Sequence, residues 1–200
     1  MEDRTRPLRA DAVRNRDRLL AAAEAVMAER GPDVSVADIA TRAGVAKGTM
    51  FRHFATKEDL VAAIVVKHMI VLADHARRLL DAPDPETALV DFLTFAADQR
   101  QQRDLAYLIS NGGSTEEATR VRGEAHDAVV ALVDRAREHG LIRSDITGTD
   151  VFLLACAPVQ VAENLPGAPS DLWRRYLAVI IDGLLRADAA PLPVPAPVWR

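Results

Sequence analysis

Cysteine is nearly absent from this chain of 200 residues, which contains only Cys156. A single cysteine excludes an internal disulfide framework, and its apolar neighbours favour a small buried side chain over a redox sensor. Long apolar runs are missing too, since none approaches the roughly 20 residues needed to cross a bilayer. The polar start of the chain has no secretory signal. We therefore expect a cytoplasmic protein with no membrane partner.

An excess of basic residues is also missing. The formal net charge is -4 at pH 7, so the chain as a whole does not attract nucleic acid. The charge is uneven, however. Residues 1–60 hold eleven Lys and Arg against ten Asp and Glu, and residues 61–200 hold fourteen against nineteen. Because attraction to phosphate depends on local charge, the N-terminal part is the better place for a nucleic-acid contact.

Sequence signatures of common enzymes are absent. The chain has no Gly-x-Ser-x-Gly, His-Glu-x-x-His, Gly-x-Gly-x-x-Gly or phosphate-loop pattern. It also has no cluster of His, Cys, Asp and Glu at the spacing of metal ligands. We therefore predict that the protein is not an enzyme and binds no metal or cofactor. The alternative, an all-helical hydrolase or isomerase, would be detected by a turnover screen.

Helix-forming residues dominate what is present, and valine recurs at helical spacing, so we predict an all-α protein. Pro158 should kink or shorten its helix. Residues 1–9 are expected to be a flexible arm whose arginines either enter a minor groove or remain solvated. Four prolines after Ala189 predict an extended, disordered tail over 188–200. Helices are expected at about 10–30, 36–43, 46–53, 57–81, 85–101, 103–111, 115–139, 148–163 and 170–186.

Residues 35–60 carry the most informative pattern. Ser35, with an aspartate three residues later, caps a short helix, and Gly44 supplies the left-handed conformation of a tight turn. A second short helix follows, in which Met50 and Phe54 lie four residues apart and should point inward. Two short helices joined by a glycine turn and packed on the helix at 10–30 form a helix-turn-helix. The second of them is the helix that would enter a major groove.

This segment resembles the DNA-binding domain of the TetR/AcrR family of repressors. The resemblance covers roughly residues 14–65 and rests on the turn Gly44-Val45 and on the stretches 47–54 and 56–60. It implies an N-terminal three-helix helix-turn-helix domain over 10–56. A larger helical domain over 57–187, which binds an effector and dimerises, would follow. The partners would be a double-stranded DNA operator, a second copy of the chain and a small molecule.

The resemblance also implies contacts with DNA. Phe51 stands where the family usually has tyrosine, so the hydrogen bond from a tyrosine hydroxyl to a phosphate is missing and only apolar contact remains. His53 also fits local packing, and Lys57 also fits an ordinary surface position. An adaptor that kept the helix-turn-helix as a scaffold would show no salt-dependent DNA binding. The residues expected at DNA are Lys47, Gly48, Thr49, Phe51, Arg52, His53 and Lys57.

Candidate residues for an effector pocket follow from helical spacing. His68 and His75 share one face of the fourth helix with Leu60, Ile64 and Val71, where they either line a pocket or are satisfied core histidines. Neither the effector nor the choice between repression and activation can be read from the sequence. Further candidates for an apolar wall with a few polar groups are Phe92, Phe95, Tyr107, Asn111 and His126.

The last two helices are apolar on most sides and so need burial on most sides. A second subunit supplies that burial through a two-fold four-helix bundle, and burial within one chain is the alternative. Such a dimer would present its third helices to successive major grooves of a palindromic operator, about 34–36 Å apart. An effector that favours another spacing would release the DNA. The residues expected at the interface are Val151, Leu154, Trp173, Tyr176, Leu177, Ile180, Ile181 and Leu184.

Overall fold

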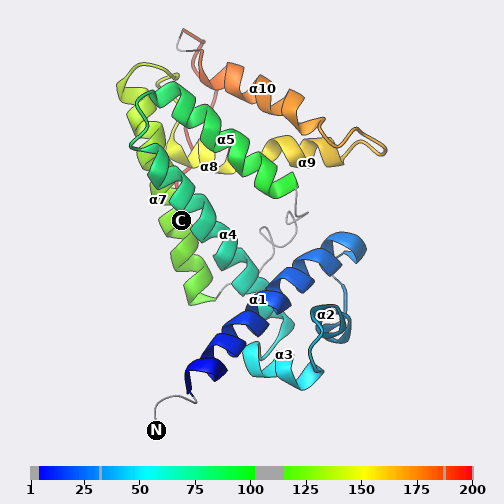
Figure 1. Ribbon diagram of the computed structural model, residues 1–200. Coiled ribbons are helices and arrows are strands. Elements are labelled where there is room, and N and C mark those ends of the chain that lie inside the picture. Colours follow the sequence, from blue (N-terminus) through cyan, green and yellow to red (C-terminus); the bar gives the residue numbers. More distant parts are fainter. Residues whose placement is uncertain (1–4, 32, 102–114, 187, 200) are drawn as a thin grey trace. The chain divides into compact units, whose positions relative to one another are not determined.

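The computed structural model describes residues 5–31, 33–101, 115–186 and 188–199 (Figure 1). Throughout these ranges the regular secondary structure is helical, as the sequence predicts. The described residues divide into two compact units. One comprises residues 5–67 and 115–118, and the other comprises residues 68–101 and 119–199. No helix in the described part of the chain is both long and apolar enough to cross a membrane.

The N-terminal unit contains the first three helices that the sequence predicts and the start of the fourth. Residues from these helices form one hydrophobic core, which includes Leu19 and Val26 of the first helix and Ile39 of the second. An ion pair between Arg42 and Glu29, 2.8 Å between Nη2 and Oε1, joins the second helix to the first. The helices are α1 (Thr5–Arg30), α2 (Val36–Ala43), α3 (Lys47–His53) and α4 (Lys57–Leu79).

Helix α1 begins earlier than the sequence predicts. It starts at Thr5 rather than near Ala10, so the expected flexible arm is wrong for residues 5–9. Pro7 does not prevent this start, because it falls in the first turn, where a backbone N–H has no partner within the helix. The remainder of the predicted arm lies outside the described residues.

In the described part of the chain, the C-terminal unit is built from the second part of α4 and five further helices. Helix α10 packs on α9 and α5, and α9 also contacts α5 and α8. Helix α8 lies so close to α7 that a Cβ atom on Gly148 would be 2.5 Å from the Cα atom of Val130. The predicted helix at 103–111 lies outside the described residues. The five helices are α5 (Pro85–Gln101), α7 (Glu116–Glu138), α8 (Gly148–Leu154), α9 (Ala157–Glu163) and α10 (Trp173–Leu184).

The predicted helix at 148–163 is divided in two. Helix α8 ends at Leu154 and α9 begins at Ala157, with Pro158 in its first turn. The expected disturbance at Pro158 is therefore confirmed. A proline at that place removes a hydrogen bond from a continuous helix but is compatible with a new first turn.

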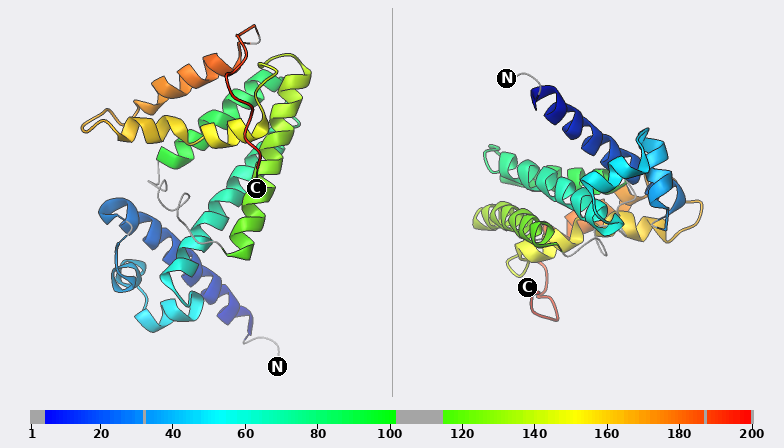
Figure 2. Two further views of the ribbon diagram at one scale, coloured as in Figure 1. Left: turned by 180° about the vertical axis from the view of Figure 1, so that it is seen from behind. Right: turned by 90° about the horizontal axis from the view of Figure 1, so that it is seen from below.

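The segment after α10 has no helix, as predicted, but the expectation that it is disordered is wrong. Figure 2 shows it running from the end of α10 past α8. The Leu192 N–H donates a hydrogen bond to Asp145, 2.8 Å, and the Trp199 ring stacks on His126 with centroids 4.4 Å apart. Composition alone could not indicate these partners, which lie far away in the sequence.

Candidate nucleic-acid interface

The turn between α2 and α3 is fixed by hydrogen bonds on both sides. The Ser35 N–H donates to Asp38 Oδ2 and the Asp38 N–H donates to Ser35 Oγ, each 3.2 Å, which closes a capping box. The hydrogen bond with Ser35 lowers the pKa of the Asp38 carboxyl below its usual value. At the other end Gly44 adopts φ +67°, and the Val45 N–H donates to the Ala40 carbonyl, 3.0 Å. The direction of α3 is therefore set by local structure.

Helix α3 is held to the core by two residues, as the sequence predicts. Met50 and Phe54 are both buried. Lys47, Gly48 and Arg52 are exposed on the rest of the helix surface. A seven-residue helix is not stable by itself, so the two buried side chains are what keep this exposed surface in place.

The exposed surface of α3 carries groups that suit a DNA contact. Arg52 donates a hydrogen bond to the Thr49 hydroxyl, 2.9 Å. The Lys47 ammonium lies 5.9 Å from the centroid of the Phe51 ring, and Phe51 is 44% exposed. A Cβ atom added to Gly48 would meet no atom within 4 Å, so the helix surface there is open. Cations, a hydroxyl and an apolar ring therefore share one small surface.

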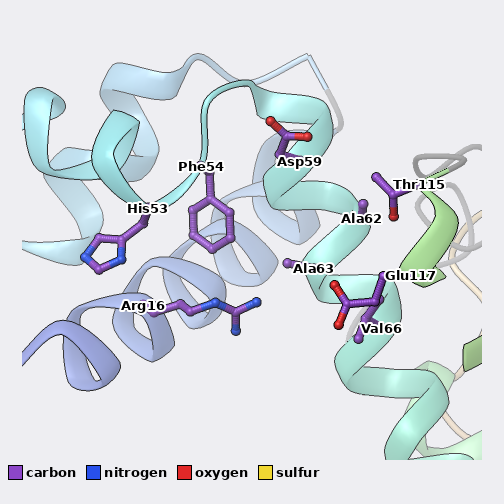
Figure 3. Close-up of a pocket in the computed structure, with 9 residues that line it drawn as sticks. All are labelled: Arg16, His53, Phe54, Asp59, Ala62, Ala63, Val66, Thr115 and Glu117. Carbon is purple, nitrogen blue, oxygen red and sulfur yellow. The ribbon is translucent and has the colours of Figure 1, made fainter. Parts of the chain in front are cut away.

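His53, the last residue of α3, and Arg16 of α1 lie at one hollow. They line a hollow of about 210 Å³, whose other wall includes Asp59 and Glu117 (Figure 3). The Arg16 guanidinium carbon is 5.4 Å from the centroid of the Phe54 ring. Sites for small molecules usually have volumes of about 300–1,000 Å³, so this hollow is small for an effector. Arg16 was not predicted, since the sequence does not distinguish it from the other exposed arginines of α1.

The start of α4 is also capped and attached to the helix-turn-helix. The Thr56 N–H donates to Asp59 Oδ2 and the Asp59 N–H donates to Thr56 Oγ1, each 3.0 Å. Lys57 lies in this first turn and is half-buried. Further along α4, Lys67 pairs with Glu24 of α1, 3.2 Å. The beginning of α4 and α1 therefore form one packed body.

Two of the predicted pocket residues lie together between α4 and α5. The rings of His75 and Phe95 are stacked, with centroids 3.9 Å apart. His75 Nε2 is 4.0 Å from Asp91 Oδ2, and Arg78 approaches Nδ1 at 3.3 Å. Burial lowers the pKa of His75 below its usual value. Burial therefore favours the neutral form of the ring.

Among the described residues, three buried side-chain polar atoms have no hydrogen-bond partner: His75 Nε2 on α4, and Gln99 Oε1 and Arg100 Nε on α5. Arg100 is 4% exposed, and its Nε is the atom without a hydrogen-bond partner. Gln99 and Arg100 were not among the predicted pocket residues, because they stand in the polar stretch at the end of α5, which has the composition of a surface. Two further predicted pocket residues, His68 on α4 and Phe92 on α5, are buried.

His126 belongs to a different group of side chains. Its Nε2 lies 3.0 Å from the Thr149 hydroxyl, and the rings of Trp199 and Phe152 lie against it, at 4.4 and 5.6 Å between centroids. It is a buried histidine with partners from its own chain. Tyr107 and Asn111 lie outside the described residues. No group of three or more His, Cys, Asp or Glu within the described part of the chain could hold a metal ion.

Half of the predicted dimer interface is part of the core of one subunit. Val151, Trp173, Leu177 and Leu184 are buried without any partner chain, so for these four the alternative, burial within one chain, replaces their assignment to the dimer interface. The reason is that α10 packs on α9 and α5, α9 also packs on α5 and α8, and α8 lies against α7, so one face of each helix is covered. The predicted residues that remain half-buried are Leu154, Tyr176, Ile180 and Ile181. Exposed apolar residues of the same helices, which were not predicted, are Leu153, Val161 and Val179.

A helix-turn-helix with an anchored second helix and a separate helical unit define a class: DNA-binding proteins with a regulatory domain. Comparison with known proteins identifies the family. Residues 19–64 match bacterial regulatory proteins of the tetR family, and residues 84–186 match the C-terminal domain of SbtR-like transcriptional regulators. The chain belongs to the TetR family of transcriptional regulators.

Individual relatives agree with this assignment. The HTH-type transcriptional repressor BepR of Brucella suis biovar 1 (strain 1330) is 32% identical over 162 residues, which are 76% of this chain and 70% of that protein. The repressor KstR2 of Rhodococcus jostii (strain RHA1) is 29% identical over 188 residues, with 84% and 90% covered. A crystal structure of a TetR regulatory protein from Mycobacterium vanbaalenii superposes with a TM-score of 0.62 at 33% identity, covering 90% of this chain and 99% of that one.

Proposed function

We propose that two copies of this protein bind a palindromic operator through their α3 helices, repress transcription there, and leave the DNA when a small molecule binds the C-terminal unit. The observation that carries the proposal is the surface of α3, where Lys47, Thr49 and Arg52 surround an open glycine. Phosphate contacts position such a helix and contacts to base edges give it specificity. The relatives BepR and KstR2 are themselves repressors, which supports repression over activation.

The DNA-binding part is tested with one variant and a matched control. Lys47→Ala removes a cation from α3, and Arg77→Ala removes one from the exposed surface of α4. We expect Lys47→Ala to weaken operator binding. It should also lower the slope of log affinity against log salt concentration by about 1, the amount that corresponds to loss of one phosphate contact. Arg77→Ala should change neither. Equal behaviour of the two variants would favour the adaptor, in which the helix-turn-helix is only a scaffold.

The dimer is supported by the apolar residues that α8, α9 and α10 leave exposed. Val179 is 64% exposed, and Leu153 and Val161 are also exposed. An apolar surface shared by neighbouring helices marks an association site, and a second copy is the usual partner in a two-fold assembly. Val179→Asp should convert the dimer to a folded monomer, measured by sedimentation equilibrium. A dimer that survives this change would place the interface elsewhere.

The effector part is supported by the unpartnered polar atoms of α4 and α5. A guanidinium is always charged, and its burial without a counter-ion costs on the order of several kcal/mol. An effector with an acidic group and an apolar body would supply a partner for Arg100 Nε, which has none among the described residues, and its apolar part would contact Phe92 and Phe95 of the same helix.

The test uses decanoate and its neutral analogue decanamide with the wild type and with Arg100→Gln. We expect decanoate to raise the melting temperature of the wild type and to weaken operator binding, and decanamide to do neither. Arg100→Gln should lose the response. A response that is equal in the variant, or equal for the amide, would contradict an acid-binding role for Arg100. DNA binding by the ligand-free protein is measured in the same series and tests the repressor function independently.

A further inference from the structure

The segment 188–199, called the strap here, is attached to the loop between α7 and α8. Arg143 donates to both carboxylate oxygens of Asp145, 2.7 and 2.9 Å, and also to the Ala190 carbonyl, 2.8 Å. Asp145 in turn accepts the Leu192 N–H, 2.8 Å. The Arg143 N–H donates to the carbonyl of Leu184 at the end of α10, 3.1 Å. One ion pair therefore holds the backbone of the strap beside the last turn of α10.

A second attachment holds the far end of the strap. The Trp199 ring lies parallel to the His126 ring, at 12° with centroids 4.4 Å apart, and meets the Phe152 ring edge-on at 5.1 Å. His126 belongs to α7 and Phe152 to α8, so the strap contacts both helices. Its path is fixed at two points by contacts within the same subunit.

Although its backbone is held, the strap leaves apolar side chains uncovered. Leu192 is 43% exposed, and Val194 and Val198 are more exposed still. Leu192 lines a groove of about 440 Å³ together with residues of α8 and α10, which include Leu154, Val179 and Ile180. This groove therefore joins the exposed apolar residues Leu153 of α8 and Val179 of α10 to the strap.

The charged groups at the groove already have partners. The two that line it are Arg143 and Asp150. Arg143 is paired with Asp145, and Asp150 accepts the Thr147 N–H, 2.8 Å, and the Thr147 hydroxyl, 2.7 Å, as the cap of α8. The groove consequently presents apolar surface without an unpaired charge. Such a surface fits another apolar surface, and it does not select an ionic ligand or nucleic acid.

We propose that a second copy of this chain covers this groove, so that the strap forms the outer edge of the dimer interface and Leu192 contributes to it directly. The inference rests on the proposed dimer and adds a segment outside the helices to it. The occupant is a second copy because the groove is continuous with the apolar surface that the dimer would bury, and a two-fold axis places the same surface opposite itself. Arg143 and Asp145 then act as positioning residues, because they hold Leu192 at the groove.

Leu192→Ser and Val198→Ser make a matched pair in one segment. Val198 is 81% exposed and is not among the residues that line the groove. We expect Leu192→Ser to raise the dimer dissociation constant by about tenfold or more, the change expected for loss of one leucine side chain from an interface. Val198→Ser should leave it unchanged. Sedimentation equilibrium gives the dissociation constants, and circular dichroism shows whether each variant remains folded; Leu192→Ala replaces Leu192→Ser if the latter does not fold.

The outcomes distinguish failure of the inference about the strap from failure of the proposed dimer. If Val179→Asp dissociates the dimer and Leu192→Ser has no more effect than Val198→Ser, the strap is an element of one subunit only and the inference is overturned. The inference is also overturned if Leu192→Ser lowers the melting temperature but leaves the dimer dissociation constant unchanged. If the wild type is monomeric, or Val179→Asp does not dissociate it, the proposed dimer itself fails.

Discussion

Gly48→Ala should change stability and DNA affinity in opposite directions. Gly48 is the second residue of α3, and an added Cβ atom would meet nothing within 4 Å. Alanine restricts the unfolded chain and favours the helix, so the free energy of unfolding should rise by up to about 1 kcal/mol. Bound DNA would occupy that open space if Gly48 permits a close backbone approach. The methyl group should therefore weaken operator binding by about tenfold, which corresponds to the loss of about 1.4 kcal/mol of binding free energy at an interface residue.

Gly44→Ala is the internal comparison for this prediction. Gly44 has φ +67°, a conformation that costs an alanine about 1–2 kcal/mol, so this variant should lower the free energy of unfolding. Chemical denaturation measures both stabilities, and fluorescence anisotropy with labelled operator DNA measures both affinities below the unfolding transition. If Gly48→Ala is more stable and binds operator as well as the wild type, Gly48 does not face DNA and the assigned orientation of α3 is wrong.

Three further changes test single groups. Phe51→Tyr would restore the hydroxyl found at this position in the family and should strengthen operator binding by about three- to tenfold in an anisotropy titration; weaker binding would show that Phe51 makes an apolar contact that the hydroxyl disturbs. The lowered pKa of His75 means that the unfolded chain takes up a proton first as pH falls, so stability should decline below about pH 6.5. His75→Phe keeps a ring against Phe95 and should reduce that decline in denaturation curves at pH 7 and 5.5, whereas an unchanged decline would assign it to other groups. Arg143 and the Leu192 N–H hold the pKa of the Asp145 carboxyl well below its usual range, so the stability it contributes is present above about pH 4 and lost only in stronger acid. Asp145→Asn should free the strap and make it sensitive to protease at neutral pH; continued resistance would show that Trp199 alone holds it.

Much of the N-terminal unit could be predicted because its signals are local. Ser35 and Asp38 cap α2, Gly44 ends it, and Met50 and Phe54 anchor α3 through their spacing. These relations span only a few residues, and each has one physical explanation. The start of α1 was missed because a polar, arginine-rich segment with a proline in its first turn has no apolar stripe to reveal it.

The C-terminal unit was harder to predict because its features depend on distant contacts. Helical spacing correctly indicated that Val151 and Leu177 are buried, but it could not tell burial by α5 or α9 from burial by a second subunit. Val71, predicted on the inner face of α4, is 37% exposed. Pairing of Asp145 with the strap and stacking of Trp199 on His126 join residues more than forty positions apart, a range over which a sequence pattern carries no signal.

The measurement that tests the central claim most directly is selection of bound sequences from random duplex DNA with the purified full chain, followed by affinity against salt concentration. The account predicts enrichment of a palindrome whose half-sites lie about 10 base pairs apart, and affinity that falls steeply as salt rises. If a folded dimer enriches no sequence and shows no salt-dependent binding, the proposed function as a DNA-binding repressor is contradicted. The helix-turn-helix would then be a structural element only.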